Sequence, residues 1–452
     1  MLVMKFGGTS VADAKRMNEV VDLVLESRGD DTETVVVVSA MAGTTDILLN
    51  AARAAAVGTV EAWQDELKAL MERHQATAAA LTTNEAERAA IFGHINNTFT
   101  ELSAVLRSID VLGELTPRAL DRVAGAGERL SAPLVSLAFR GRGFASEAVD
   151  ASVGVVITDG HFGEATPDSV ATWYGARTKL RPMLKEGIIP VVTGYVGATP
   201  DGVVTTLGRG GSDYSAAIVG AALEADEVWI WSDVDGILTA DPKIVPEARV
   251  LSNLSYLAAA ELASCGADVL HPKTIRPLVR TGVPLRLKNT FNAAHPGTLI
   301  SSRYSEHPPA IISMNDLCLV TIKAEADTWS PDVTAASLER MARAGVNVLL
   351  YLQSAWQHGV SVLVRCGDRE PAMMSAATDK LMVNVRPDVA TVSVVGAHVI
   401  IPTLAALGET GAQVLAISQA TVDAGIIVVV PADEMPPLVR HLHERVSLNH
   451  RN

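Results

Sequence analysis

The sequence has 452 residues, of which 48% are apolar and 19% are charged. This composition excludes a wholly disordered chain, and the length predicts roughly two to four domains. Asp and Glu number 51 against 37 Lys and Arg, and the net charge of −14 argues against non-specific binding to nucleic acid or to an anionic membrane.

The three cysteines, Cys265, Cys318 and Cys366, lie far apart in sequence and include no CxxC pair. They predict neither a zinc site nor a disulfide framework, and they favour a reducing, cytoplasmic location. The N-terminal segment lacks the long apolar stretch of a signal peptide, and no uninterrupted apolar run reaches about 20 residues. We therefore expect a soluble protein with no membrane partner.

Apolar, β-branched runs at residues 2–6 and 34–39 predict buried parallel strands with a helix between them. Residues 45–112 are rich in Ala, Leu, Glu and Arg, and they predict two or three amphipathic helices. Further strand patterns alternate with helical segments, at residues 144–150, 188–193, 203–206 and 227–232. The alternation predicts an α/β domain with a mostly parallel central sheet, in which ligands bind at the carboxyl ends of the strands.

Beyond residue 300 a polar, Pro-containing segment predicts a linker, and two similar units follow it. In each unit the pattern predicts a strand, a helix and two further strands, starting near 317–323 and 390–395. The stretches GVNVLLYLQSA and GAQVLAISQAT align residue for residue around Gln353 and Gln419. This repeat predicts an internal duplication of βαββαβ units.

KFGGTS, residues 5–10, places Lys5 and two glycines where the first strand ends. Glycines let the backbone approach a phosphate, and a lysine supplies a point charge to a transferred group. A strand-ending Gly-Gly is more often a plain turn, so this segment by itself favours a phosphate site only weakly.

TTLGRGGSDYSAA, residues 205–217, surrounds Arg209 with glycines and places Ser212 or Asp213 where either would cap the following helix. This arrangement favours a carboxylate or phosphate site over an ordinary capped helix. In WSDVDGILTADPKI, residues 231–244, Asp233 or Asp235 is a candidate for ribose, adenine or a magnesium-bound water, and Lys243 for phosphate. A solvated turn explains that last segment equally well.

Of two familiar nucleotide motifs, one matches only weakly and the other is absent. Gly125 and Gly127 in RVAGAGERLSA do not complete a dinucleotide fingerprint, because Leu130 stands where a third glycine is required. The sequence also contains no GxxxxGK[ST], which excludes a P-loop.

Taken in order, KFGGTSV, GERLSA, TTLGRGGSDYSAA, WSDVDGILTADP, VLHP and PGTLI resemble the aspartate kinase branch of the amino acid kinase family. The two C-terminal units resemble the tandem ACT domains that bind regulatory amino acids in these enzymes. The resemblance implies an amino acid kinase fold over residues 1–300, followed by ferredoxin-like ACT domains at 311–385 and 386–452. It also implies transfer of a phosphoryl group from ATP to the side-chain carboxylate of aspartate, the first step of lysine, threonine and methionine biosynthesis, with Mg²⁺ bound mainly through the nucleotide.

The resemblance assigns roles to individual residues. The residues that it implies for ATP binding are Lys5, Gly7, Gly8, Ser10, Ser232, Asp233 and Lys243. At aspartate it implies Thr45, Glu128, Arg209, Gly210, Gly211 and Ser212, with Arg209 on the α-carboxylate and Glu128 near the ammonium. The catalytic residues implied are Lys5, Arg209 and Asp213, and the regulatory residues are Asn347, Gln353 and Gln419.

Some positions depart from the family pattern. Asp268 stands where related enzymes often carry a lysine, for which Lys273 is a candidate replacement, and Leu238 replaces a common aromatic residue. Gly425 stands where an asparagine is frequent, so we expect altered or lost feedback by threonine or lysine. LKNT, PGTLI and SDVDG resemble the kinase half of bifunctional aspartokinase and homoserine dehydrogenase proteins, which slightly favours threonine. The end at Asn452 predicts a monofunctional kinase, and pairing of ACT domains predicts a homodimer or higher oligomer.

Two other hypotheses fit the motifs. The first keeps the fold and changes the acceptor to glutamate, acetylglutamate or a nucleotide. The second is a non-catalytic amino-acid sensor, suggested by Asp268 and the duplicated units.

Overall fold

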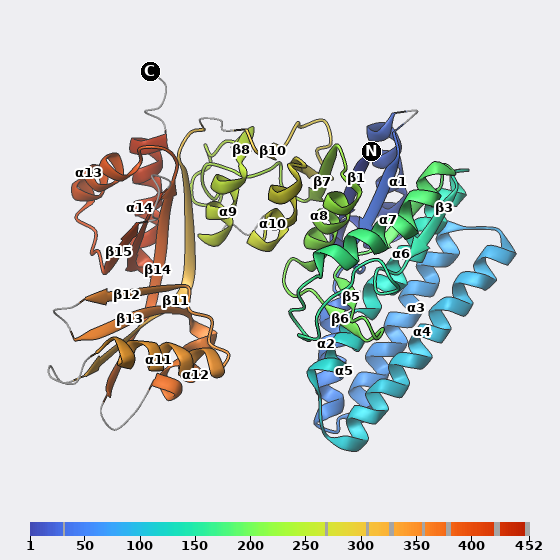
Figure 1. Ribbon diagram of the computed structural model, residues 1–452, viewed down its shortest axis with the longest axis horizontal. Coiled ribbons are helices and arrows are strands. Elements are labelled where there is room, and N and C mark those ends of the chain that lie inside the picture. The colour runs from blue at the N-terminus through green and yellow to red at the C-terminus, as the bar shows by residue number, and fades with distance from the viewer. Residues whose placement is uncertain are drawn as a thin grey trace. The chain divides into compact units, whose positions relative to one another are not determined.

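The structure is a computed structural model that describes residues 1–29, 32–266, 270–303, 307–324, 330–354, 358–376, 381–419 and 425–447 (Figure 1). The chain divides into two compact units. The N-terminal unit comprises residues 1–237, 252–260 and 268–305, and the C-terminal unit comprises residues 238–251, 261–267 and 306–452. The domain limits expected from the sequence stay predictions. Within the described ranges, no helix is both long enough and apolar enough to cross a bilayer.

The described part of the N-terminal unit is built on an eight-stranded sheet with the order β3-β4-β2-β1-β7-β9-β10-β8. Its strands are β1 (Leu2–Phe6), β2 (Thr34–Val38), β3 (Ser146–Val149), β4 (Ile189–Thr193), β7 (Glu227–Ser232), β8 (Asn253–Ser255), β9 (Leu285–Asn289) and β10 (Thr298–Ser301). All neighbouring pairs are parallel except β9 with β10. The mostly parallel central sheet expected from the sequence is confirmed.

One expected strand lies outside this sheet. β6 (Val204–Thr206) pairs antiparallel with β5 (Val196–Ala198) in a separate two-stranded sheet. The reason is local, because a turn held by the bond from Thr199 N–H to the Val203 carbonyl folds the chain back on β5. The run at 203–206 therefore predicts a strand correctly but not its sheet.

Alternation along β1 decides which side chains reach each face of the sheet. Met4 and Phe6 join the core formed with α1 (Ala14–Arg28) and α6 (Ala126–Gly141). Val3 faces α8 (Gly211–Leu223), where a Cβ on Gly220 would lie 3.8 Å from Val3 Cγ2. Because successive residues of a strand point to opposite faces, Lys5 shares the α8 face with Val3.

The helical segment after β2 contains α2 (Thr44–Ala56), α3 (Val60–Leu81) and α4 (Glu85–Leu112). This outcome confirms the amphipathic helices predicted there, and Figure 1 shows α3 and α4 side by side. The short helix α5 (Pro117–Ala124) leads into α6, while α7 (Ser169–Lys185) and α10 (Pro272–Thr281) pack against α8. Buried apolar side chains such as Trp63 and Ile95 join these helices to the core beneath the sheet.

The described part of the C-terminal unit forms one six-stranded antiparallel sheet, with the order β12-β13-β11-β14-β16-β15. The strands are β11 (Ala310–Ala324), β12 (Leu350–Ser354), β13 (Gly359–Arg365), β14 (Leu381–Val395), β15 (Ala416–Gln419) and β16 (Gly425–Pro431). The helices are α11 (Pro331–Arg343), α12 (Arg369–Ala376), α13 (Ile400–Thr410) and α14 (Met435–Leu442). This sheet is the antiparallel architecture expected for two ACT units.

The duplication is visible in the strand register. Gln353 pairs with Val360 between β12 and β13, and Gln419 pairs with Ile426 between β15 and β16. The two copies share one sheet through β11 and β14, which are longer than the strands expected at 317–323 and 390–395. A register shift between Met314 and Leu317 breaks the two-residue alternation, so the sequence pattern shows only part of β11.

The C-terminal unit also contains the segment that directly follows β7 and its loop. Ala240 and Val245 lie in the same buried cluster as Val428 of β16. Thr239 Oγ1 lies 3.0 Å from His443 Nε2 in this interior. Lys243, a nucleotide candidate from the motifs, therefore lies on a turn that is built into the C-terminal unit.

Two of the cysteines that lie far apart in sequence are neighbours in the structure. Cys318 Sγ lies 2.8 Å from Cys366 Sγ, although both are free thiols. β11 and β13 are adjacent, and this adjacency brings together two residues that are 48 positions apart.

Candidate active site

Lys5 and Asp213 form an ion pair at the carboxyl end of β1. Lys5 Nζ lies 2.5 Å from Asp213 Oδ1, and the two side chains are only 11% and 17% exposed. The alternation of β1 turns Lys5 toward α8, and the first turn of α8 carries Asp213. The fold thus brings together the KFGGTS motif, which contains Lys5, and the TTLGRGGSDYSAA motif, which contains Asp213.

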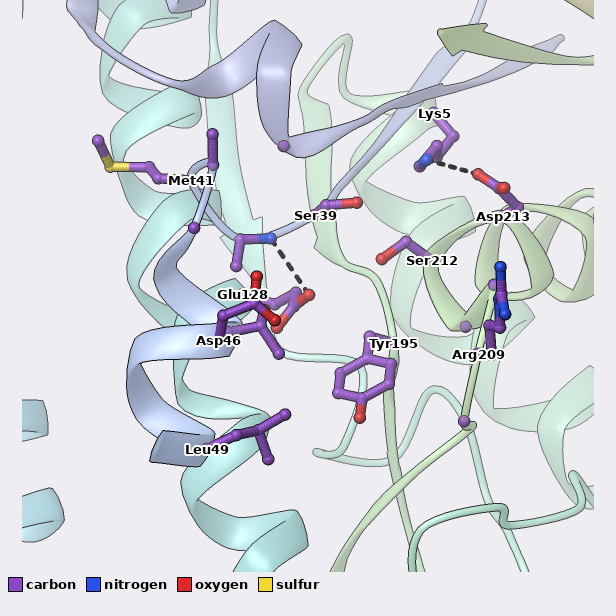
Figure 2. A pocket seen from close by; sticks show the side chains of 18 of the residues that line it. Lys5, Ser39, Met41, Asp46, Leu49, Glu128, Tyr195, Arg209, Ser212 and Asp213 are labelled. Carbon is purple, nitrogen blue, oxygen red and sulfur yellow. Dashed lines mark hydrogen bonds and ion pairs between the residues drawn. The ribbon is translucent and has the colours of Figure 1, made fainter. Parts of the chain in front are cut away.

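A cavity of about 670 Å³ lies beside this ion pair (Figure 2). Its wall is formed by the ends of β1 and β2, by the first turns of α2 and α8, and by the beginning of α6. The wall includes nine of the residues that the resemblance assigns: Lys5, Gly8, Thr45, Glu128, Arg209, Gly210, Gly211, Ser212 and Asp213. Lys5 and the beginning of α8 therefore face one cavity, as the motif analysis requires.

Two of the glycines in this wall are needed for close approach. A Cβ on Gly8 would lie 2.9 Å from the Ala40 carbonyl oxygen, so the loops after β1 and β2 could not meet. Gly210 has a φ of +71°, and a Cβ there would lie 2.7 Å from His271 Cβ. Both glycines line the cavity at positions where a Cβ would clash with a neighbouring segment.

The helices α2 and α8 both begin at this cavity without a side-chain cap. Their N-cap residues are Gly43 and Gly210, each in the left-handed conformation. The expectation that Ser212 or Asp213 caps α8 is wrong, because both lie inside its first turn and the Asp213 carboxylate pairs with Lys5. Uncapped first turns present free N–H groups and the positive end of the helix dipole, which suits anions.

Glu128 is the buried acid of the cavity. Its side chain is 3% exposed, and Oε1 accepts a hydrogen bond of 3.1 Å from the Ala40 N–H. Oε2 is buried and has no hydrogen-bond partner among the described residues. Burial raises the pKa of Glu128 to about 8, against the opposing effects of the Ala40 N–H and the Lys5 charge. A cation bound beside Oε2 would shift this carboxyl to its ionised form.

Sequence reasoning missed Tyr195, which stands in the wall between Glu128 and Arg209 (Figure 2). Its φ is +67°, which is unusual for a residue with a side chain, and its N–H donates to Ser215 Oγ at 2.9 Å. Burial raises the pKa of the Tyr195 phenol. The signal was available, since GYVG directly follows β4 and so stands at the ligand-binding edge of a parallel sheet.

The wall also includes residues of the loop after β2, of α2 and of two other loops to which the resemblance assigns no role: Ser39, Met41, Asp46, Leu49, Gly163 and Gly208. Ser39 and Asp46 belong to a segment whose small residues and hydroxyls follow a strand, so their position agrees with the strand-end rule. Gly163 lies in a loop without a recognisable motif, and nothing in the sequence points to it.

Other predicted nucleotide residues lie outside this wall. Ser10 is buried, with its Oγ 2.9 Å from Thr290 Oγ1, and Gly7 lies next to Lys5, where a Cβ would be 3.6 Å from Lys5 Nζ. Ser232 is the last residue of β7 and Asp233 follows it. The preceding residue, Trp231, pairs with Phe6 of β1. These two residues therefore share the sheet edge with Gly7, whereas Lys243 belongs to the C-terminal unit.

The remaining predicted residues are placed as follows. Lys273 forms an ion pair with Glu164, and Asp268 lies outside the described residues. Asn347 is exposed between α11 and β12, and Gln353 and Gln419 are exposed on β12 and β15, at opposite edges of the sheet.

Gly210→Ala is expected to raise KM for the ligand that the resemblance assigns to Arg209 by about tenfold or more. The reason is that backbone strain of ~1–3 kcal/mol at residue 210 displaces the neighbouring guanidinium. Gly187→Ala is the matched control, since Gly187 has a φ of +74° but no atom within 4 Å of its Cβ position. Steady-state kinetics and melting temperatures of the two variants check this. Equal effects of both substitutions would show that backbone strain alone, and not the contact with His271, matters.

Comparison with known proteins identifies the family that this chain resembles. Residues 1–289 match the family model described as the amino acid kinase family. Aspartokinase 2, chloroplastic, of Arabidopsis thaliana is 40% identical over 306 residues, which cover 66% of this chain and 54% of that protein. The crystal structure of E. coli aspartokinase III in complex with aspartate and ADP superposes with a TM-score of 0.84 at 28% identity over 99% of both chains. Its complex with lysine and aspartate gives a TM-score of 0.81 at the same identity and coverage.

The chain spans about half the length of the curated relatives it matches, such as 51% of bifunctional aspartokinase/homoserine dehydrogenase 2, chloroplastic, of Arabidopsis thaliana. The family model nevertheless covers well over half of this chain, including all the residues of the cavity wall. The chain therefore belongs to the amino acid kinase family.

Proposed function

We propose that the chain is an aspartate kinase that transfers the γ-phosphoryl group of ATP to the side-chain carboxylate of aspartate. The observation that carries the proposal is one cavity whose wall holds Lys5, Arg209, an uncapped helix terminus and Glu128, whose Oε2 has no hydrogen-bond partner in the part of the chain that the structure describes. An amino acid with two carboxylates and an ammonium group complements this wall. The relatives named above, which are aspartokinases, support the same substrate.

Glu128 and Arg209 would hold the backbone end of aspartate. The ammonium group would meet Glu128 Oε2, which otherwise has no partner among the described residues, and the attraction would ionise the carboxyl. Arg209 supplies a planar donor that matches a carboxylate, here the α-carboxylate. Thr45, in the uncapped first turn of α2, lines the cavity and would offer its hydroxyl and its N–H to the same ligand.

Phosphoryl transfer needs alignment and charge neutralisation more than proton transfer. An oxygen of the aspartate side chain bonds to the γ-phosphorus, and the bond from that phosphorus to the β,γ-bridging oxygen of ATP breaks to release ADP. The attacking carboxylate is already a nucleophile, so no general base is required. Lys5 neutralises charge on the transferred group, and Asp213 holds the lysine ammonium in place.

We propose ATP and Mg²⁺ as the nucleotide and cation, and ADP bound to E. coli aspartokinase III supports the nucleotide. Within the described ranges, no group of three or more His, Cys, Asp or Glu side chains gathers to hold a metal. The residues fit an ion held mainly by phosphate oxygens, with Asp213 as the protein carboxylate nearest to Lys5. The ion would neutralise phosphate charge.

The test is formation of an acyl phosphate, trapped as a hydroxamate. Purified protein with ATP, Mg²⁺ and hydroxylamine is expected to give hydroxamate with aspartate. Under identical conditions, glutamate and N-acetylglutamate are expected to give at most a few per cent of that rate, and a nucleotide acceptor is expected not to consume ATP. A faster reaction with another acceptor would refute aspartate as substrate. Amino-acid binding by calorimetry with no ATP binding would support a sensor instead.

We propose further that the C-terminal unit binds an amino-acid effector and mediates homo-oligomer formation. The complex of E. coli aspartokinase III with lysine and aspartate supports an effector of this class. The hydroxamate assay with added lysine or threonine decides between them, and light scattering measures the oligomer. Location in the cytoplasm also stays a proposal, since the plant relatives are named as chloroplastic.

A further inference from the structure

Asp121 lies on α5, behind the cavity wall, and belongs to none of the motifs in the sequence. Its side chain is buried, with 2% exposure. The carboxylate accepts three hydrogen bonds: Oδ2 from Gly163 N–H at 2.9 Å and from Thr206 N–H at 2.8 Å, and Oδ1 from Thr206 Oγ1 at 2.8 Å. One buried carboxylate thus satisfies donors from the loop that contains Gly163 and from the end of β6, which leads into the Arg209 loop; these two loops are distant in sequence.

Both of these loops form the cavity wall. Gly163 lines it directly, and Thr206 precedes the glycine-flanked Arg209 by three residues. The loops also touch each other, since a Cβ on Gly208 would lie 3.1 Å from the Gly163 carbonyl oxygen. In addition, Ala165 N–H donates to the Thr206 carbonyl at 2.9 Å. Asp121 therefore holds the two loops together through hydrogen bonds to its carboxylate.

We infer that Asp121 is a positioning residue that fixes the Arg209 loop for the α-carboxylate of the amino-acid substrate. This inference rests on the proposed function, because it takes aspartate as the ligand of Arg209. Asp121 is not among the residues of the cavity wall, and its side chain accepts hydrogen bonds from Thr206 and Gly163. We therefore expect Asp121 to affect the binding and alignment of aspartate, and to have little effect on the residues after β1 that are assigned to ATP.

The chemistry of the three bonds predicts which substitutions preserve the loop. In Asp121→Asn the side-chain oxygen can accept both N–H groups, and the amide can donate to Thr206 Oγ1, since a hydroxyl also accepts. Asp121→Ala leaves all three donors buried without partners, so the loops shift to find others. The asparagine variant thus separates the effect of the three hydrogen bonds from the effect of the negative charge of Asp121.

The test measures KM for aspartate, KM for ATP and kcat for three variants, each at a temperature well below its own melting temperature. Asp121→Ala is expected to raise KM for aspartate by about tenfold or more and to lower kcat, with KM for ATP within about twofold of wild type. Asp121→Asn is expected to restore KM for aspartate to within about threefold of wild type. Thr205→Val is the matched control, because Thr205 lies beside Thr206 on β6. The substitution removes a buried hydrogen bond of 2.7 Å between the Thr205 and Thr158 hydroxyls but no bond to Asp121.

The inference is overturned if Asp121→Ala leaves KM for aspartate unchanged, if Asp121→Asn behaves like the alanine variant, or if Thr205→Val reproduces the same loss. Should Asp121→Ala fail to fold, Thr206→Val serves instead, because it removes one of the three bonds and is expected to raise KM for aspartate by a smaller factor. Absence of hydroxamate with the wild-type protein would refute the proposed function itself. Calorimetric affinities of the same variants for aspartate would then test Asp121 independently.

Discussion

Lys5→Ala is expected to lower kcat by about 100-fold or more, because losing one preorganised charge donor costs ~3–4 kcal/mol of transition-state stabilisation. Lys5 is held by Asp213 at 2.5 Å in the cavity wall, so its charge is in place before the reaction begins. KM for aspartate should change much less than kcat, since Glu128 and Arg209 are assigned to that ligand. A coupled assay of ADP release measures both constants.

Two controls sharpen this prediction. Lys15→Ala removes a lysine of α1 that is 83% exposed and forms a long ion pair with Glu19 at 3.9 Å, so wild-type kinetics are expected. Lys5→Ala combined with Asp213→Asn removes the unpaired carboxylate that the single variant leaves, and kcat is not expected to recover. Recovery in the double variant would mean that the stranded Asp213 charge, and not the missing lysine, caused the loss. Wild-type kcat in Lys5→Ala would refute the assignment.

Glu128→Gln is expected to raise KM for aspartate by about 100-fold, because a buried partner of the ammonium charge is lost at a cost of ~2–5 kcal/mol. The substitution preserves shape, and its amide oxygen can still accept the Ala40 N–H. Glu85→Gln at the exposed beginning of α4 is the control and should leave KM unchanged. Calorimetry with aspartate and no nucleotide gives the affinity directly.

Without ligand and at high pH, the Glu128→Gln protein is expected to be more stable than the wild type. Burial raises the pKa of Glu128 from 4.5 to about 8, so the folded state binds more protons than the unfolded state between these values. Stability is therefore lost as pH rises from about 4.5 through about 8, and Glu128→Gln removes this loss. Its melting temperature should exceed that of the wild type near pH 9 and converge with it near pH 5.

Addition of aspartate provides the complementary readout. At pH 9 aspartate should raise the melting temperature of the wild-type protein and leave that of Glu128→Gln almost unchanged, since binding to the folded state alone is stabilising. A wild-type stability that does not fall between pH 5 and pH 9 relative to the variant would contradict the raised pKa.

The positions of several strands along the chain and the glycine-rich motifs were predictable because their signals are local. Alternation and β-branched residues identify β1, β2, β4 and β7, and the repeat around Gln353 and Gln419 identifies the duplicated C-terminal half. Capping of α8 was not predictable, since Ser212 and Asp213 look like caps until the helix is seen to begin after Gly210. The roles assigned by resemblance stay proposals, although nine of those residues share one cavity wall.

By itself the sequence determined the classes of element, the parallel sheet with its ligand edge, and the family motifs, because each depends on residues close together in the chain. Only the tertiary structure decided that Lys5 meets Asp213, that Glu128 is an acid with a raised pKa, and that Asp121 fastens two loops of the cavity. The physical reason is that ion pairing, desolvation and buried hydrogen bonds depend on which distant segments pack together, and a pattern of neighbouring residues does not contain that information.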